Sequence, residues 1–153
     1  MTVAAAETRT FRVSPEAISA VDTWIEEVGN RWGLDERTAF GARLCVAEIA
    51  TNVLEHGGGS SAQPAEIAVT LRRRGDGLDI DIADSGRPFD PRTKPDAALP
   101  ETLEEAAIGG LGLRLVRAYA SEIDYHHDGV RNHHRLHLPA AATRKPSLST
   151  TPP

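Results

Sequence analysis

The stretch EIATNVLEHG, residues Glu48–Gly57, decides the fold of this chain. Glu48, Asn52 and His56 recur every four residues, which stacks their side chains on one face of a helix. Asn, Thr and His are mediocre helix formers, whereas solvated helix faces are usually filled with Lys, Arg and Glu. The polar stripe is therefore expected to face something other than bulk water, and an ordinary amphipathic helix is the alternative. The opposite, apolar face is expected to carry Val46, Ile49, Ala50, Val53 and Leu54.

Helix signals extend outward from this stretch toward the N-terminus. Asp35 can cap the helix that contains the stretch, and a glycine run starting at Gly57 ends it. An earlier helix is predicted to begin at Ser14-Pro15-Glu16, which supplies an N-cap, a first-turn proline and an early acid. Apolar residues follow at helical spacing until Gly33 stops the pattern.

The remaining apolar segments alternate with period two and predict strands. Glycine-containing turns join them into two hairpins, at Gly75-Asp76-Gly77 and at Asp128-Gly129. The predicted strands are Phe11–Val13, Glu66–Arg73, Leu78–Ile82, Ile123–His126 and His133–Leu138. Helices combined with a mostly antiparallel sheet predict an α+β two-layer sandwich with helices on one face of the sheet.

The composition is that of one globular domain: 153 residues, 40% apolar and 25% charged. We expect a folded domain over residues 9–139, with disordered ends at 1–8 and 140–153 where small and polar residues dominate. The single cysteine, Cys45, excludes an internal disulfide framework and is expected to be a small, half-buried filler.

Charge and hydropathy exclude two classes of partner. The net charge of −5 argues against a broad nucleic-acid surface. No apolar run approaches the roughly 18 residues of a membrane span, and the first residues lack the pattern of a signal peptide. A cytoplasmic protein without nucleic-acid or membrane partners is therefore expected.

Two further segments lie on turns where chemistry is plausible. In DIADSGRPFDP, a strand ends at Asp84, whose carboxylate can accept hydrogen bonds from a ligand amine, and Gly86 lets that ligand approach the backbone. In IGGLGLRLV, glycines precede an amphipathic helix and expose backbone N–H groups that can hold phosphate oxygens. An ordinary turn and an ordinary helix cap are the respective alternatives. The long loop between them, Pro88–Ile108, is typical of a functional lid.

In that order, the three segments resemble the N box, G1 box and G2 box of the GHKL ATPase superfamily. The close spacing and the terminal segment DGVRNHHRLHLP are most similar to the bacterial anti-sigma-factor serine kinases, the partner-switching branch. The resemblance covers Phe11 to Leu138. It implies a Bergerat-type ATP-binding fold and the cofactors ATP and Mg²⁺.

The resemblance also implies roles for individual residues. Asn52 would bind Mg²⁺ through its side-chain oxygen, and Glu48 would be the general base that takes a proton from an attacking serine or threonine hydroxyl. Asp84 would hold the adenine amine. The other nucleotide-binding residues would be His56, Gly86, Phe89, Gly109, Gly110, Leu111, Gly112 and Leu113. His56 has a structural alternative, as a partner of the helix dipole at the last turn.

The implied activity is phosphorylation of a small anti-sigma-factor antagonist with a STAS domain by a homodimeric kinase that also sequesters a sigma factor. The alternatives are a non-catalytic ATP-binding switch module and the ATP-binding fragment of a histidine kinase, which is disfavoured because these 153 residues contain no helical hairpin with a phosphoacceptor histidine. Two departures from the family pattern bear on this: Pro88 replaces the second glycine of the G1 box, and the first helix is acidic, which weakens the case for sigma binding.

Two questions stay open. The cation that contacts the γ-phosphate is one of four candidates, Arg87, Arg92, Lys94 and Arg114. Five of the six histidines fall between His126 and His137, and alternation places His133 and His137 on one strand face and His134 on the other. A solvated strand face is favoured over a metal site.

Overall fold

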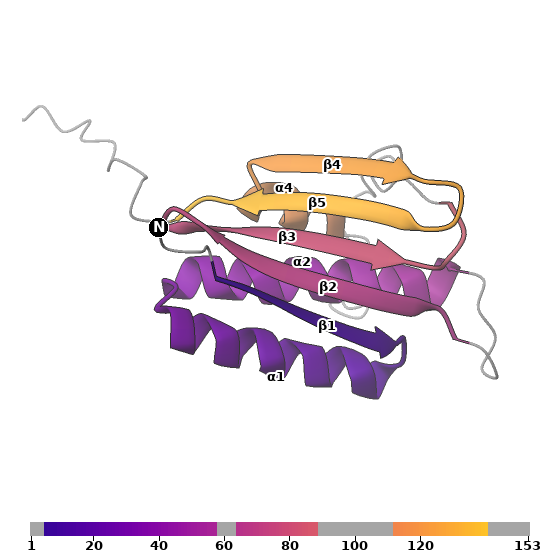
Figure 1. Ribbon diagram of the computed structural model, residues 1–153, viewed down its shortest axis with the longest axis horizontal. Helices are drawn as coiled ribbons and strands as arrows, with labels where there is room; N and C mark the ends of the chain where they lie inside the picture. The colour runs from indigo at the N-terminus through magenta and orange to yellow at the C-terminus, as the bar shows by residue number, and fades with distance from the viewer. Residues whose placement is uncertain (1–4, 58–63, 89–111, 141–153) are drawn as a thin grey trace, which may run out of the picture.

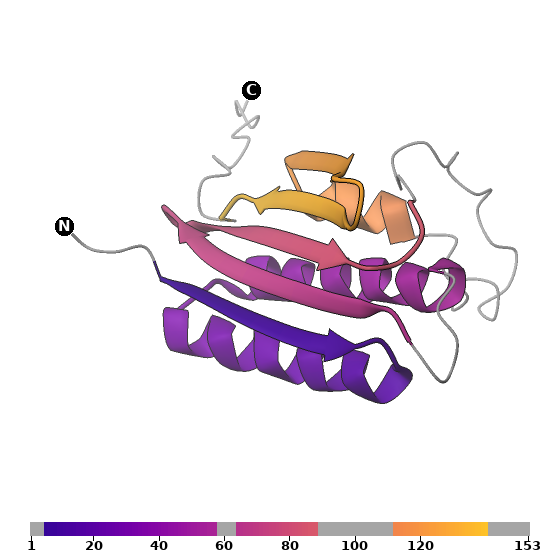
Figure 2. The same cartoon turned by 45° about the vertical axis from the view of Figure 1, so that its right-hand side comes forward.

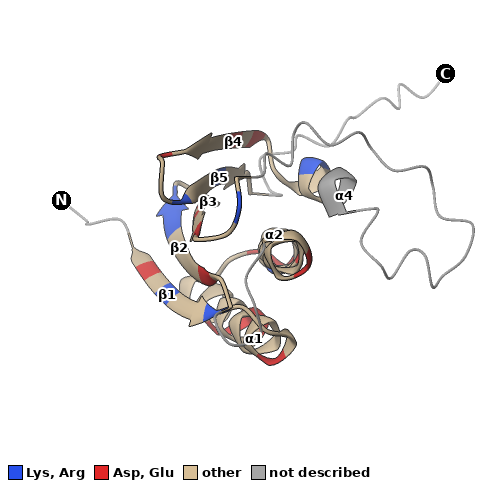
Figure 3. Ribbon diagram, turned by 90° about the vertical axis from the view of Figure 1, so that its right-hand side faces the viewer, with Lys and Arg blue, Asp and Glu red and all other residues tan. Residues whose placement is uncertain are grey.

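An antiparallel sheet forms one layer of the protein, and helices cover one of its faces (Figure 1, Figure 2). The computed structural model describes residues 5–57, 64–88 and 112–140. Among these residues the strand order is β1-β2-β3-β5-β4, and every neighbouring pair is antiparallel. Figure 3 shows the two layers end-on, with the helices together on one side of the sheet. The predicted α+β two-layer sandwich is confirmed.

The strands follow the predicted alternation, with bounds that differ by a few residues. They are β1 (Ala6–Arg12), β2 (Glu66–Arg74), β3 (Gly77–Asp84), β4 (Glu122–His127) and β5 (Asn132–Leu138). β3 is the central strand, and it pairs with β2 on one side and β5 on the other. β2 and β3 form the hairpin predicted around Gly75, whose φ of 60° is left-handed, as this tight turn requires.

Both predicted helix starts are confirmed. α1 (Pro15–Trp32) begins at Ser14, whose hydroxyl accepts from the Ala17 N–H at 3.0 Å, and it ends at Gly33 with a φ of 65°. α2 (Glu36–His56) begins at Asp35, which accepts from the Thr38 N–H at 2.8 Å. α4 (Gly112–Tyr119) is the short helix after the second glycine segment. Among the described helices, none is long and apolar enough to cross a membrane.

The core lies between the sheet and the two long helices. The in-facing residues of β2, β3 and β5 are buried, and they pack against the apolar side of α2, where Val46, Ile49, Ala50 and Val53 are buried. Cys45 is fully rather than half buried, and this burial raises the pKa of its thiol to about 12, with the nearby charge of Glu48 as a second cause. One predicted core position is wrong: Leu54 is 40% exposed.

The ordered chain extends further at both ends than the sequence predicts. β1 begins at Ala6, inside the 1–8 segment expected to be disordered, and it pairs with β2 along its whole length. Glu7 holds Arg31 of α1 in an ion pair of 2.8 Å, which ties this strand to the helix layer. At the other end Ala140 is buried, although the disordered tail was expected to start there. Residues 1–4 and 141–153 lie outside the described ranges.

Replacing Gly41 with alanine is expected to destabilise the protein by about 1–3 kcal/mol. A Cβ at this α2 position would lie 2.6 Å from the ring of Tyr119, which packs α4 onto α2, so the ring must move. Gly29→Ala in α1 is the matched control, because its Cβ would meet only Ala39 and Leu34, at 3.3 Å and 3.9 Å. Urea unfolding of both variants checks this, and equal midpoints would contradict the packing role of Gly41.

Candidate functional site

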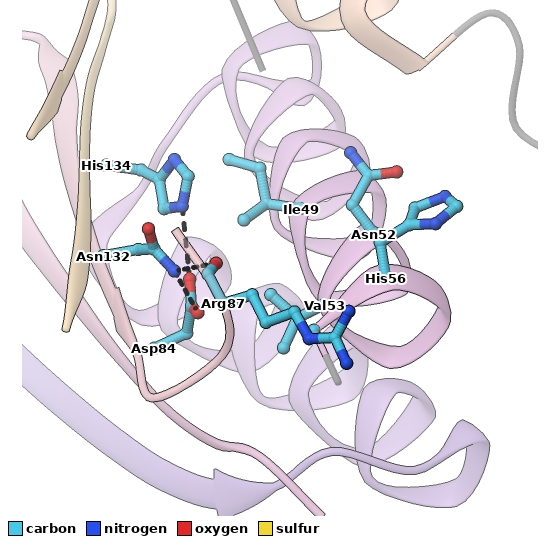
Figure 4. Close-up of a pocket in the computed structure, with 9 residues that line it drawn as sticks. Ile49, Asn52, Val53, His56, Asp84, Arg87, Asn132 and His134 are labelled. Atoms are coloured by element: carbon cyan, nitrogen blue, oxygen red, sulfur yellow. Dashed lines mark hydrogen bonds and ion pairs between the residues drawn. The ribbon is translucent and has the colours of Figure 1, made fainter. Parts of the chain in front are cut away.

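A pocket lies where the C-terminal half of α2 meets the end of β3 and the start of β5 (Figure 4). One wall comes from the helix and the other from the sheet and the turn after β3. Its lining residues are Ile49, Asn52, Val53, His56, Gly57, Asp84, Arg87, Asn132 and His134. Two of the three segments singled out in the sequence therefore meet in one cavity.

The helix wall of the pocket mixes polar and apolar side chains. Ile49, Asn52, Val53 and His56 stand at positions i, i+3, i+4 and i+7, which share one face of an α-helix. Figure 4 shows Asn52 and His56 next to each other on this wall. Ile49 and Val53 are buried, as predicted for the apolar face, and they also line the pocket because it lies over the boundary between the two faces.

Glu48 does not line this pocket among the described residues. It is half-buried on α2, one turn before Asn52. Burial raises the pKa of its carboxyl above the ordinary 4.5, and the negative charge of Glu55 raises this pKa further. A raised carboxyl pKa is the direction that favours proton uptake by a general base.

Asp84 is a buried carboxylate, 1% exposed, at the sheet wall of the pocket. Its Oδ1 accepts from the Gly86 N–H and from Asn132 Nδ2, both at 2.9 Å. Its Oδ2 lies 3.2 Å from Nε2 of the buried His134. Burial of a charge is costly unless it is paired and hydrogen-bonded, and these three contacts satisfy that requirement.

The turn after β3 packs directly on the end of α2. The Arg87 N–H donates to the Gly57 carbonyl oxygen at 3.0 Å, and a Cβ at Gly86 would lie 3.0 Å from Asp84 Oδ1 and 3.1 Å from the Gly57 Cα. Gly86 itself does not line the pocket. The close approach of two backbones therefore requires a glycine at this position.

The sequence resemblance implies nucleotide binding, and Gly86→Ala is expected to weaken such binding by about tenfold, because the new methyl group displaces Asp84 or Gly57 by a few tenths of an ångström. Nucleotide titration by calorimetry checks this. Ser85→Ala is the matched control in the same turn, since the Ser85 hydroxyl contacts the Glu66 N–H rather than the pocket. Unchanged affinity in Gly86→Ala would show that the turn tolerates the methyl group.

Two polar side chains of the pocket were missed as site candidates, those of Asn132 and His134. Both are buried, 2% and 5% exposed, and both contact Asp84. The expectation that the histidine segment forms a solvated strand face is therefore wrong for His134. Its position two and four residues before the core residues Leu136 and Leu138 was the signal that could have placed it inside.

His133 and His137 lie on the opposite face of β5, as the alternation predicted. They contact Asp128 and Asp79, each at 2.6 Å. Among the described residues, no group of three or more His, Cys, Asp or Glu side chains could hold a metal ion. A single carboxamide such as Asn52 can still fit Mg²⁺, which keeps several waters and binds proteins through one or two oxygen ligands together with phosphates.

The second glycine segment lies mostly outside the described residues. Phe89, Gly109, Gly110, Leu111 and the predicted lid belong to residues 89–111, which the structure does not describe. Gly112 and Leu113 are the first residues of α4. Of the four candidate cations for a γ-phosphate, Arg87 lines the pocket.

The sequence of the chain is similar to those of known proteins. Residues 11–138 match a family model described as a histidine kinase-like ATPase domain. The serine/threonine-protein kinase BtrW of Bordetella bronchiseptica is 32% identical over 129 residues, covering 83% of this chain and 90% of BtrW. The serine-protein kinase RsbW of Bacillus pumilus is 29% identical over 115 residues, which cover 72% of this chain and 71% of RsbW.

A solved structure shares the fold. A crystal structure of the RsbU and RsbW domains of Rv1364c from Mycobacterium tuberculosis superposes with a TM-score of 0.61 at 18% identity. The match covers 89% of this chain, and this chain spans about a third (34%) of that longer one. At this identity the likeness supports the fold alone.

Proposed function

Because the chain belongs to the histidine kinase-like ATPase domain family, we propose that it is a Mg·ATP-dependent protein serine/threonine kinase. The observation that carries the proposal is the pocket in which the buried, hydrogen-bonded Asp84 faces the Asn52 side of α2. The names of the two curated relatives, both protein kinases acting on serine or on serine and threonine, support the class of reaction.

Asp84 would recognise the adenine ring through its amine. A carboxylate offers about four acceptor positions, and the described contacts of Asp84 use three of them. The position left on Oδ2 suits one N–H donor from a ligand. The apolar side chains of Ile49 and Val53 in the helix wall would pack against the ring.

Asn52 would hold Mg²⁺ through its carboxamide oxygen, with His56 beside it on the same wall. Bound there with the phosphates, the ion would neutralise negative charge during transfer. Arg87 supplies a cation at the pocket for the terminal phosphate. Gly109, Gly110, Leu111, Gly112 and Leu113, with Phe89, would complete the nucleotide site.

Glu48 would act as the general base. Its half-buried position and raised pKa favour removal of a proton from a serine or threonine hydroxyl presented beside α2. The phosphoacceptor would be a small anti-sigma-factor antagonist with a STAS domain, and a sigma factor would be a second partner of a homodimeric kinase.

Capture of partners from extracts of the native host, with and without ATP, identifies the antagonist. The purified pair is then incubated with Mg·ATP, and phosphoserine or phosphothreonine on the partner is measured by mass spectrometry. Phosphate on a single hydroxyl of the partner, lost in Glu48→Gln, is the expected result. Nucleotide binding without any transfer would overturn the kinase assignment.

The second candidate is an ATP-binding switch module without catalysis. The observation that favours it is the absence of Glu48 from the pocket lining among the described residues. In that case ATP would change partner affinity while no phosphate reaches the partner. The same incubation separates the two functions, because affinity and phosphorylation are measured on one pair of proteins.

A further inference from the structure

Asn132 lies directly opposite Asp84 in the sheet. β3 pairs with β5 in a register that makes these two residues cross-strand partners, and both side chains are buried on the same face of the sheet. Figure 4 shows the Asn132 carboxamide pointing at the Asp84 carboxylate and the turn that follows it. None of the roles implied by the three sequence segments includes this residue.

The orientation of the Asn132 carboxamide is fixed by its contacts. Its Nδ2 donates to Asp84 Oδ1 at 2.9 Å, to the Arg87 carbonyl oxygen at 2.8 Å and to the Gly86 carbonyl oxygen at 3.3 Å. Its Oδ1 accepts from the Tyr125 hydroxyl of β4. Because the acceptors all lie on one side and the donor lies on the other, a flipped amide would lose these bonds.

This arrangement fills one oxygen of the Asp84 carboxylate. Oδ1 receives two N–H donors, from Asn132 and from Gly86, and a carboxylate oxygen has about two acceptor positions. Only Oδ2, which is also in contact with His134, can accept a further donor. A nucleobase bound in the pocket can therefore present one N–H group to Asp84 but not two.

Adenine and guanine differ in this respect. Adenine offers one exocyclic amine, whereas guanine pairs with a carboxylate through two adjacent donors, its ring N–H and its amine, which need both oxygens. We propose that Asn132 determines base specificity by occupying Asp84 Oδ1, so that the pocket accepts a 6-amino purine and rejects guanine. The inference rests on the proposed role of the pocket as an adenine nucleotide site.

The test is the ratio of the dissociation constants for GTP and ATP, measured by calorimetry on the full chain with Mg²⁺. In Asn132→Ala one acceptor position of Oδ1 becomes available, and we expect the preference for ATP over GTP to fall by about tenfold, the size expected for one hydrogen bond to a charged group. In an Asp84→Asn background the same substitution should leave the ratio unchanged, because the two residues act as one unit.

His137→Ala is the matched control, since this residue lies on the opposite face of β5 and contacts Asp79. The ratio of the GTP and ATP dissociation constants in this variant should equal that of the unsubstituted protein. If Asn132→Ala does not fold, Asn132→Ser replaces it, because a serine side chain is too short to span the same contacts, and the same fall is expected.

Parallel loss of ATP and GTP affinity with a constant ratio would overturn the specificity role and leave Asn132 a structural residue. Absence of any nucleotide binding by the unsubstituted protein would overturn both this inference and the proposed function. Nucleotide binding with the expected change of ratio but no transfer to a partner would overturn the kinase assignment alone.

Discussion

Glu48→Gln is expected to lower the rate of phosphoryl transfer by about a thousandfold while leaving ATP affinity within roughly twofold. The amide keeps the shape of the side chain but cannot take up a proton. Glu48 does not line the described part of the pocket, so its loss should not disturb the nucleotide. Single-turnover transfer to the purified partner measures the rate, and calorimetry measures the affinity.

Glu55→Gln is the matched control for this substitution. Glu55 is an exposed carboxylate on the same helix, and its charge contributes to the raised pKa of Glu48. We expect the transfer rate of this variant to stay within a few-fold of the unsubstituted protein. A transfer rate in Glu48→Gln equal to that of Glu55→Gln would rule out Glu48 as the base.

The same Glu48→Gln variant is expected to be more stable than the unsubstituted protein at neutral pH, by about 2 °C in melting temperature. The folded-state pKa of Glu48 lies above its ordinary value of 4.5, so the folded protein binds more protons than the unfolded chain between these two pKa values. Stability is therefore lost as the pH rises through that window.

As the pH falls below 4.5, the Glu48 carboxyl becomes protonated in both the folded and the unfolded state. The difference in melting temperature between the unsubstituted protein and the Glu48→Gln variant should therefore shrink toward zero. Thermal melts of the two proteins at pH 4 and pH 7 check this pH dependence. An equal difference at both values would mean that the stability change does not come from the ionisation of Glu48.

Local signals predicted the helices and the central hairpin because each depends on residues close in the sequence. Ser14 and Asp35 cap helices through N–H groups three residues ahead, and Gly33 and Gly75 adopt the left-handed conformations that a helix end and a tight turn need. Each of these interactions involves residues within a few positions of one another, so periodicity and residue type suffice to find them.

The start of β1 could not be found this way. Its residues, AETRTFR, show no clean alternation because most of the strand is exposed on both faces at the edge of the sheet. Its order depends on pairing with β2, about sixty residues later, and on the ion pair between Glu7 and Arg31. Long-range pairing of this kind has no local signature.

The sequence predicted only part of the candidate site. The sequence located Asn52, His56 and Asp84, which the structure brings into one pocket. The side-chain partners of Asp84 come from β5, 48 and 50 residues further along the chain, and only the register of β3 with β5 places them beside it. Chemistry-bearing residues can thus be recognised by type and spacing, whereas the groups that orient them require the tertiary fold.

Asn52→Ala is expected to lower the transfer rate by about a hundredfold or more, because charge stabilisation by a metal ion contributes several kcal/mol to such reactions. Alanine removes the carboxamide on the α2 wall of the pocket that we propose as the Mg²⁺ ligand. The loss should fall on the Mg²⁺-dependent part of ATP binding, so the affinities of Asn52→Ala and of the unsubstituted protein should agree when EDTA removes the ion.

Asn52→Asp separates the metal role from a packing role. It keeps an oxygen of the kind that Mg²⁺ prefers at nearly the same position, so the stimulation of ATP binding by Mg²⁺ should persist in this variant and disappear in Asn52→Ala. Calorimetric titration of ATP with and without Mg²⁺ measures both. If Asn52→Ala weakens binding equally in Mg²⁺ and in EDTA, the carboxamide supports the pocket rather than the ion, and the metal ligand lies elsewhere in the chain.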